Sequence, residues 1–197
     1  MAQLISDLTR AAILSMDLQT AIVSIYAKSQ PDFLPRVASV LKEARERAMT
    51  VIHVQVGFRP GFPEVSEHNQ LFGAIKTSAQ WQQVFQGPAG AIHPDVAPVN
   101  DEIVVTKHRV NAFHGTDLEM ILRAKEIDTL VLFGIATSGV VLSTLLDASD
   151  ADYRLIVVKD CCFDLDADVH ACLIEKVFPR RATVLSADEL REALNSN

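Results

Sequence analysis

Six short runs of apolar residues recur along the chain, and few polar side chains interrupt them. Strands that are buried on both faces have this pattern, because neither face meets water, and the abundance of Val and Ile favours strands over helices. The predicted strands are residues 11–16, 50–56, 102–106, 129–133, 154–159 and 182–185.

Longer segments with helical spacing lie between these runs. In residues 33–48, apolar side chains recur every three or four positions and charged side chains occupy the opposite face. Thr116 and Ser186 each precede a glutamate by three positions, which is the spacing of a capping box at the start of a helix. Helices are therefore predicted at residues 33–48, 138–151, 167–178 and 186–194, and from Thr116 onward.

The alternation of strands and helices predicts an α/β fold. We expect a six-stranded, mostly parallel sheet with helices on both faces, which is a three-layer, Rossmann-like arrangement. The chain has 197 residues, of which 49% are hydrophobic and 22% are charged. Those values are typical of one compact domain with a large core, so we expect a single domain over residues 1–197.

Residues 57–101 depart from the alternation, because they hold five of the eight prolines and five of the eight glycines. A stretch of this length is too long for an ordinary connection, and long loops in compact α/β domains are often lids or binding loops. We expect a short helix near residues 79–85. Arg59 and Trp81 lie on this stretch and are candidates for contacting a substrate, Arg59 through the fork of its guanidinium.

The charge balance favours a small molecule as the ligand. The net charge is −7 and the chain has no run of Lys or Arg, which argues against nucleic acid or an anionic membrane as a partner. No segment reaches 18 apolar residues, and the first residues lack a signal-peptide pattern. The three cysteines form no CxxC pair, which argues against a zinc site or a disulfide framework and predicts a cytoplasmic protein.

Two charged residues end predicted strands, where ligands of open α/β sheets bind. Asp17 follows the first strand and Lys107 follows the third. Taken singly, Asp17 could equally cap a turn, and Lys107 could be a solvated strand end. If the two strands were neighbours, a partly buried Asp–Lys pair could move a proton, since burial and mutual charge shift both pKa values.

The fourth predicted strand runs into six mostly small residues, 134–139, before the next helix. The first turn of a helix has N–H groups without intrahelical partners, so this turn can stabilise negative charge. Phe113 and His114, near Lys107, are further candidates for lining the site. We interpret His53 as a core histidine, and the adjacent Cys161 and Cys162 as small buried hydrophobic side chains.

Almost the whole chain resembles the isochorismatase-like, or cysteine hydrolase, superfamily. The resemblance rests on the order and spacing of several motifs rather than on any one of them. They are ILSMDLQ, VVTKHRVNAFHGTDLEMIL and IDTLVLFGIATSGVVLSTLLDASDADYRLIVVKDCC, followed by the region of His170 and the last strand.

The resemblance implies a role for each matching position. In that family an Asp ends the first strand, a Lys ends the third, and a nucleophilic Cys opens the helix after a G-[IV]-A-T-x-x-C turn. These positions correspond to Asp17, Lys107 and Val140. The family's backbone donors would be the N–H groups of Ala136 and Val140, and its cis peptide would join Ile135 to Ala136. Members are commonly homo-oligomers, so we expect a dimer or a tetramer.

Two departures from the family pattern affect the function. Val140 cannot attack a substrate, so the thiolate chemistry of the family's amidases is unavailable at that position. The metal ligands of nicotinamidases, an Asp-x-His after the second strand, are replaced by residues 56–58, Val-Gly-Phe, so we expect neither a metal nor another cofactor. Isochorismatases themselves also lack the Cys, although they usually carry Gly there, and they protonate a vinyl ether with the Asp.

Three functions therefore stay open. The first is a small-molecule hydrolase that uses the Asp17–Lys107 pair without a cysteine nucleophile. The second is a catalytically inactive member that binds a small molecule in the retained pocket, which the inert Val140 favours. The third is a structural subunit of a larger assembly.

Overall fold

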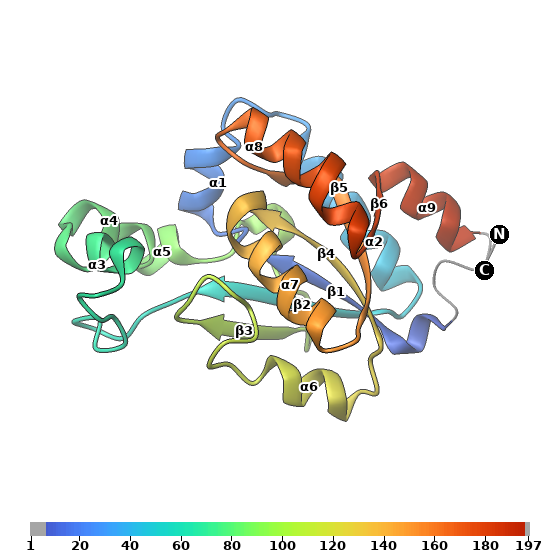
Figure 1. Cartoon of the computed structure of the whole chain (residues 1–197), viewed down its shortest axis with the longest axis horizontal. Helices are drawn as coiled ribbons and strands as arrows, with labels where there is room; N and C mark the ends of the chain where they lie inside the picture. Colours follow the sequence, from blue (N-terminus) through green and yellow to red (C-terminus); the bar gives the residue numbers. More distant parts are fainter. Residues whose placement is uncertain (1–6, 196–197) are drawn as a thin grey trace.

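The computed structural model describes residues 7–195 and contains a six-stranded sheet in which every neighbouring pair of strands is parallel (Figure 1). The strand order is β3-β2-β1-β4-β5-β6, so the chain moves outward from β1 in one direction and then from β4 in the other. The strands are β1 (Ala11–Met16), β2 (Thr50–Val56), β3 (Ile103–Lys107), β4 (Thr129–Ile135), β5 (Arg154–Phe163) and β6 (Thr183–Leu185). This sheet confirms the predicted fold class.

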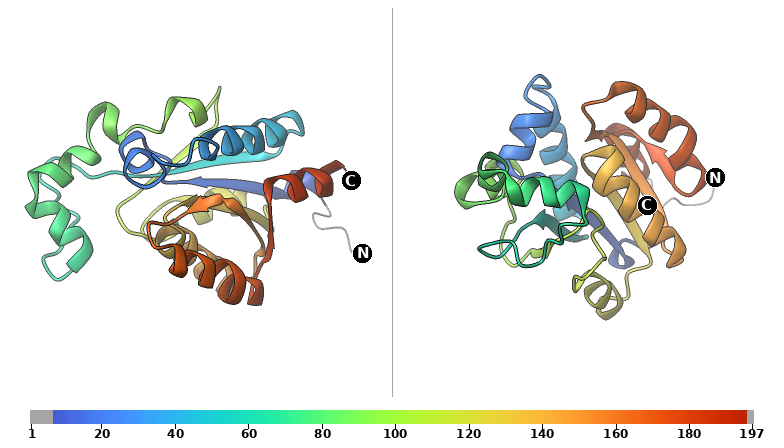
Figure 2. Two further views of the ribbon diagram at one scale, coloured as in Figure 1. Left: turned by 90° about the horizontal axis from the view of Figure 1, so that it is seen from above. Right: turned by 60° about the vertical axis from the view of Figure 1, so that its left-hand side comes forward.

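Helices cover both faces of the sheet, as Figure 2 shows when the sheet is seen edge-on. α2 (Phe33–Glu46) packs on one face together with α9 (Ala187–Asn195), and α7 (Leu142–Asp150) and α8 (Ala167–Cys172) lie on the other. The remaining α-helices in the part of the chain that is described are α1 (Thr20–Tyr26), α3 (Gln70–Thr77), α4 (Ala79–Val84), α5 (Gly87–Gly90) and α6 (Leu118–Ala124). None of the helices in residues 7–195 is long and apolar enough to cross a bilayer.

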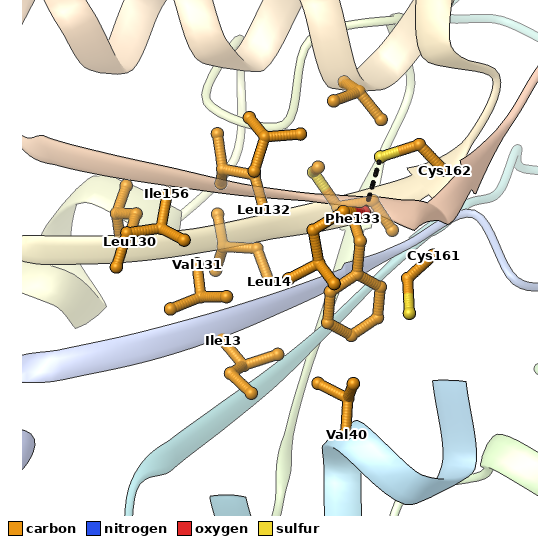
Figure 3. Close-up of a cluster of buried hydrophobic side chains, with 14 of the residues drawn as sticks. Ile13, Leu14, Val40, Leu130, Val131, Leu132, Phe133, Ile156, Cys161 and Cys162 are labelled. Carbon is orange, nitrogen blue, oxygen red and sulfur yellow. Dashed lines mark hydrogen bonds between the residues drawn. The ribbon is translucent and has the colours of Figure 1, made fainter. Parts of the chain in front are cut away.

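The core lies between the sheet and its helices, and the central strands β1 and β4 are buried along their whole length. Figure 3 shows Ile13, Val131 and Phe133 among the side chains that fill it. Cys161 and Cys162 belong to this core, on opposite sides of β5, and the Cys162 thiol donates to the Val158 carbonyl at 3.4 Å. Strands this apolar need cover on both faces, which explains the three layers.

Several strand limits differ from the prediction. β5 continues to Phe163, so Asp160 and both adjacent cysteines lie inside the strand rather than beyond its end. Glu102 precedes β3 instead of opening it, and its carboxylate accepts hydrogen bonds from Arg45 at 2.7 and 2.8 Å. The same carboxylate lies 3.0 Å from Nε2 of the buried His53, which accounts for that histidine as a core residue.

The helix starts were predicted with mixed success. The capping box at Ser186 is present, since its hydroxyl accepts from the Glu189 N–H and the Glu189 carboxylate accepts from the Ser186 N–H. The capping box predicted at Thr116 is wrong. The N-cap of α6 is Asp117, one residue after Thr116, and the Glu119 carboxylate pairs instead with Arg123, one turn along the helix. Thr116 still accepts a hydrogen bond from the Leu118 N–H at 3.2 Å.

The first part of the segment of residues 57–101, which carries α3, α4 and α5, projects beyond the carboxyl ends of the strands (Figure 1). It contains the short helix that was expected, here α4, and also α3, which the sequence analysis did not predict. A small apolar core of its own holds the segment together, with Phe58 stacked on Phe62 at a centroid distance of 4.9 Å. Because the segment is folded rather than open, it can form one wall of a pocket.

Candidate functional site

A pocket of about 360 Å³ opens where the strands end at their carboxyl edge. Its floor is made by residues that end β1, β2, β3 and β4, and its walls come from α1, α3 and α4. The chain reverses its direction of strand addition between β1 and β4, and such a switch point is where open α/β sheets bind ligands. The fold therefore places a cavity at the expected edge of the sheet.

Asp17 and Lys107 meet at the floor of this pocket. The Lys107 Nζ lies 2.8 Å from the Asp17 Oδ2, and both side chains are almost wholly buried. β2 lies between the strands that carry them, so the pair forms although β1 and β3 are not neighbours, the condition under which it was expected from the sequence. Adjacent strands are about 4.8 Å apart, and only a long side chain such as Lys reaches across the end of the intervening strand.

Lys107 has a further hydrogen-bond partner in addition to Asp17, whereas one oxygen of Asp17 has none among residues 7–195. The Lys107 ammonium also donates to the Arg109 carbonyl at 3.0 Å. The Asp17 Oδ1, by contrast, is buried without a hydrogen-bond partner among residues 7–195. Burial raises the pKa of Asp17 above its ordinary value, and the nearby Lys107 charge opposes this only in part. The free oxygen therefore belongs to a carboxyl group that takes up a proton more readily than a solvated Asp.

The turn after β4 forms the wall beside Asp17. The peptide bond between Ile135 and Ala136 is cis, as the family resemblance implies, and residues Thr137–Val141 form a single π-helical turn. The turn is anchored from β5 and α8: the Ser138 N–H donates to Asp164 at 2.8 Å, and the Thr137 hydroxyl lies 2.8 Å from the His170 Nδ1. Ala136, Gly139 and Val140 line the pocket, and the Val140 side chain is buried there.

The structure brings only some of the proposed substrate contacts to the pocket. Trp81 lines it from α4. Arg59 does not, because its exposed guanidinium pairs with Glu64 at 2.5 Å. Phe113 packs against Tyr153 at a centroid distance of 6.1 Å, and His114 lines a separate, shallower pocket.

Aromatic and aliphatic residues that the sequence analysis did not single out complete the walls. They are Ile22, Ile25, Tyr26, Leu71, Phe72, Ala74, Ile75, Val84, Phe85 and Val110. Ile22, Ile25 and Tyr26 recur at three- and four-residue spacing on α1, a signal that could have revealed this helix and its inward face. Burial and the charges of Asp164 and Asp17 raise the pKa of Tyr26, so its hydroxyl stays protonated.

The cysteines do not contribute a thiolate to the site. Neither Cys161 nor Cys162 lines the pocket, and burial raises the pKa of the Cys162 thiol to about 12 and that of Cys161 as well. Within residues 7–195, no three His, Cys, Asp or Glu side chains converge as the ligands of a metal ion would. What the site offers is a buried carboxyl group and its lysine partner in an apolar cavity, beside the turn that follows β4.

Residues 11–189 match the isochorismatase domain. The chain is 30% identical to the isochorismatase family protein YwoC of Bacillus subtilis (strain 168) over 190 residues, which cover 94% of this chain and 95% of YwoC. It is 26% identical to the maleamate amidohydrolase of Pseudomonas putida over 171 residues, or 86% of this chain and 78% of that protein.

Solved structures show the same fold. An isochorismatase family protein from Burkholderia thailandensis matches with a TM-score of 0.78 at 26% identity, over 95% of this chain and 96% of the other. A cysteine hydrolase from Pseudomonas syringae pv. phaseolicola matches with a TM-score of 0.85 at 22% identity, over 96% and 94%, which is a likeness of fold alone. The match over residues 11–189 carries the assignment: the chain belongs to the isochorismatase family of hydrolases.

Proposed function

We propose that the protein hydrolyses a small molecule by acid catalysis from Asp17, without a cysteine nucleophile. The observation that carries the proposal is the Asp17 carboxyl group, which is buried at the pocket floor with one oxygen on Lys107 and the other without a partner in residues 7–195. An acid catalyst needs a group that is protonated near the working pH and within reach of the substrate. The raised pKa of Asp17 supports the first requirement, and its place in the pocket lining supports the second.

The hydrolysis of a vinyl ether suits this arrangement. Asp17 donates its proton to the terminal carbon of the double bond, and the resulting oxocarbenium ion is attacked by water. The Asp17 carboxylate then takes a proton from that water, and the hemiacetal collapses to a carbonyl compound and an alcohol. The reaction uses one carboxyl group twice and requires no protein nucleophile.

The roles of the other groups follow from their positions. Lys107 holds the carboxyl group in one orientation and, through its charge, keeps the pKa of Asp17 from rising further. The N–H groups of Ala136 and Val140 belong to the turn that lines the pocket, where they would stabilise the carbonyl oxygen of an amide substrate as it becomes negative. The similarity to a maleamate amidohydrolase makes amides the second class of substrate to test.

A purely binding function is the alternative that a specific observation favours. Val140 is buried in the pocket at the position that the family resemblance assigns to the nucleophile. Mass spectrometry of ligands that copurify with the protein separates the two functions. A ligand that stays unchanged through prolonged incubation supports binding alone, whereas its conversion to hydrolysis products supports the enzyme.

Turnover and its pH dependence test the acid mechanism. Isochorismate, simple vinyl ethers, amides and carbamates form the panel, and we expect hydrolysis of a vinyl ether. The acid form of Asp17 predominates below its raised pKa, so kcat should be constant at low pH and fall about tenfold per pH unit above that pKa.

Lys107→Met removes the charge that lowers the pKa of Asp17, so the decrease in kcat should begin at a higher pH than in the parent protein. If the pH at which kcat falls is the same in Lys107→Met as in the parent, Lys107 does not influence the pKa of Asp17. If no substrate of the panel is hydrolysed, the proposed function is contradicted.

Val140→Cys tests whether position 140 faces the reacting group. The new thiol would lie in the pocket lining beside Ala136, and we expect it to react with iodoacetamide and to give measurable amidase activity. Cys161 and Cys162 are buried and their thiols stay protonated, so the parent protein provides the baseline, to which only the exposed Cys172 contributes. A thiol at position 140 that resists modification in the folded protein would show that this position does not face an open pocket.

A further inference from the structure

The pocket lining contains two ionisable side chains, Asp17 and Lys107, and the Lys107 ammonium is already held by Asp17 at 2.8 Å and by the Arg109 carbonyl at 3.0 Å. All the lining residues fall within the described part of the chain. A ligand carboxylate that entered this cavity would lose its hydration and find no uncommitted cation. It would also approach the free oxygen of the Asp17 carboxyl group, which becomes negative once its proton is transferred. The floor of the pocket therefore disfavours anionic ligands.

The cations of residues 57–101 and of the loop after β3 have acceptors elsewhere in the protein. The Arg59 guanidinium pairs with Glu64, and the Lys76 ammonium donates to the Val65 carbonyl at 3.1 Å. Arg109 donates to the carbonyl groups of His108 and Glu64 at 2.6 and 2.9 Å. None of these three cations lines the pocket, and each already has an acceptor within the protein, so an acidic ligand could pair with one only by displacing that acceptor.

The walls of the pocket are aromatic and aliphatic from floor to mouth. Phe72, Ile75 and Phe85 form the inner wall, and three large apolar side chains at the rim are exposed: Ile25 (40%), Leu71 (57%) and Trp81 (46%). These three come from α1, α3 and α4, so apolar surface surrounds the entrance on several sides. Exposed apolar groups that converge on one cavity mark a binding site for an apolar molecule.

The size of the cavity sets an upper limit on the ligand. An apolar cavity of about 150 Å³ holds one benzene molecule. The pocket, at about 360 Å³, has room for an aromatic ring with a substituent of similar size. The polar groups converge at the floor, where Asp17 and the backbone turn at Ala136 lie, so the ligand needs one polar group at one end only.

We propose that the ligand of this pocket is an uncharged molecule with an aromatic or branched aliphatic body and a single hydrolysable group, an enol ether or a carboxamide, at the end that meets Asp17. The hydrolysis of that group rests on the proposed function, whereas the preference for uncharged, apolar ligands rests on the lining alone. The preference for uncharged ligands excludes dianions and other acidic molecules as good substrates.

Fluorescence of Trp81 measures binding independently of turnover, because Trp81 is the only tryptophan of the chain and lies in the pocket wall. The probes are phenyl vinyl ether and its 4-carboxylate, which differ by one negative charge. We expect saturable quenching by both, with a Kd at least tenfold lower for the uncharged ether. Equal or tighter binding of the carboxylate overturns the inference, and so does the absence of saturable binding of the uncharged ether.

A matched pair of variants tests the cause of the preference. Leu71→Arg places a cation at the rim and should improve binding of the carboxylate at least fivefold. Met120→Arg, a change at another exposed apolar residue, on α6 and outside the pocket, should leave both dissociation constants unchanged. If both arginine variants change the ratio of the two Kd values by the same factor, the preference for the uncharged ether does not arise in the pocket, and the inference fails. Release of phenol and acetaldehyde is followed separately: tight binding of the uncharged ether without release supports the inference and counts against the hydrolysis of vinyl ethers proposed above.

Discussion

Asp17→Asn is expected to lower kcat/KM at least 1000-fold on any substrate that the protein hydrolyses. Removal of a positioned general acid alone lowers rates about 100- to 10,000-fold, and here the same carboxyl group also receives the proton of the attacking water. Asn keeps the shape of the side chain and its contact with the pocket, but its amide cannot supply a proton. Steady-state rates with the best vinyl ether of the panel give the measurement.

A loss of activity in this variant has to be separated from a loss of stability. The substitution leaves the Lys107 ammonium buried without its counter-charge, which costs about 3–5 kcal/mol when one partner of a buried pair is removed. The double variant Asp17→Asn/Lys107→Met removes both charges, so it should recover most of that stability in thermal unfolding. It should remain as inactive as the single variant, because the acid is still missing.

Asp32→Asn is the control for the chemistry of the substitution. Asp32 is exposed, lies outside the pocket and makes no capping hydrogen bond with its side chain, so both kcat/KM and stability should be unchanged. A double variant that is stable and retains more than a tenth of the parental kcat/KM would show that Asp17 is not the acid.

Much of the fold could be predicted from the sequence because buried parallel strands leave a direct signal. The apolar runs at residues 11–16 and 50–56 coincide with β1 and β2 residue for residue, since a strand with two covered faces carries few polar side chains. The carboxyl end of β5 was placed too early, because Asp160 interrupts the apolar run although the strand continues. Asp160 is tolerated there since Arg36 pairs with it at 3.2 Å.

The pocket was less predictable because it is built from side chains that meet only in the folded chain. Asp17 and Lys107 could be named from the ends of their strands, but the order of the strands, with β2 between them, is a property of the whole sheet. Arg59 has the chemistry of a carboxylate ligand, yet Glu64, five residues along, takes its guanidinium. The substrate contact predicted for Arg59 is therefore absent, because the guanidinium forms an ion pair with a nearby residue of the same loop.

Gly134 is the backbone position where we expect the largest effect on stability. It lies near the end of β4, opposite Met16 on β1, and its φ of +145° is a conformation that residues with a side chain rarely adopt. A Cβ added there would lie 2.0 Å from the Met16 carbonyl oxygen. That oxygen belongs to the backbone of a central strand, so it cannot move aside as a flexible side chain would. The residue after Met16 is Asp17, so any displacement also disturbs the pocket floor.

Gly134→Ala should therefore destabilise the protein by more than about 4 kcal/mol, which corresponds to a fall in Tm of at least about 8 °C for a chain of this size. Gly139→Ala, five residues along the same turn, is the matched control. Its added Cβ would have its nearest neighbours at 3.8 Å, which is ordinary contact, so its Tm should stay within about 2 °C of the parent or rise slightly, because Ala restricts the unfolded chain. Thermal unfolding followed by circular dichroism gives both values. Equal Tm values for the two variants would contradict this prediction. They would show that the backbone of β1 at Met16 does not lie close enough to Gly134 to exclude a Cβ atom.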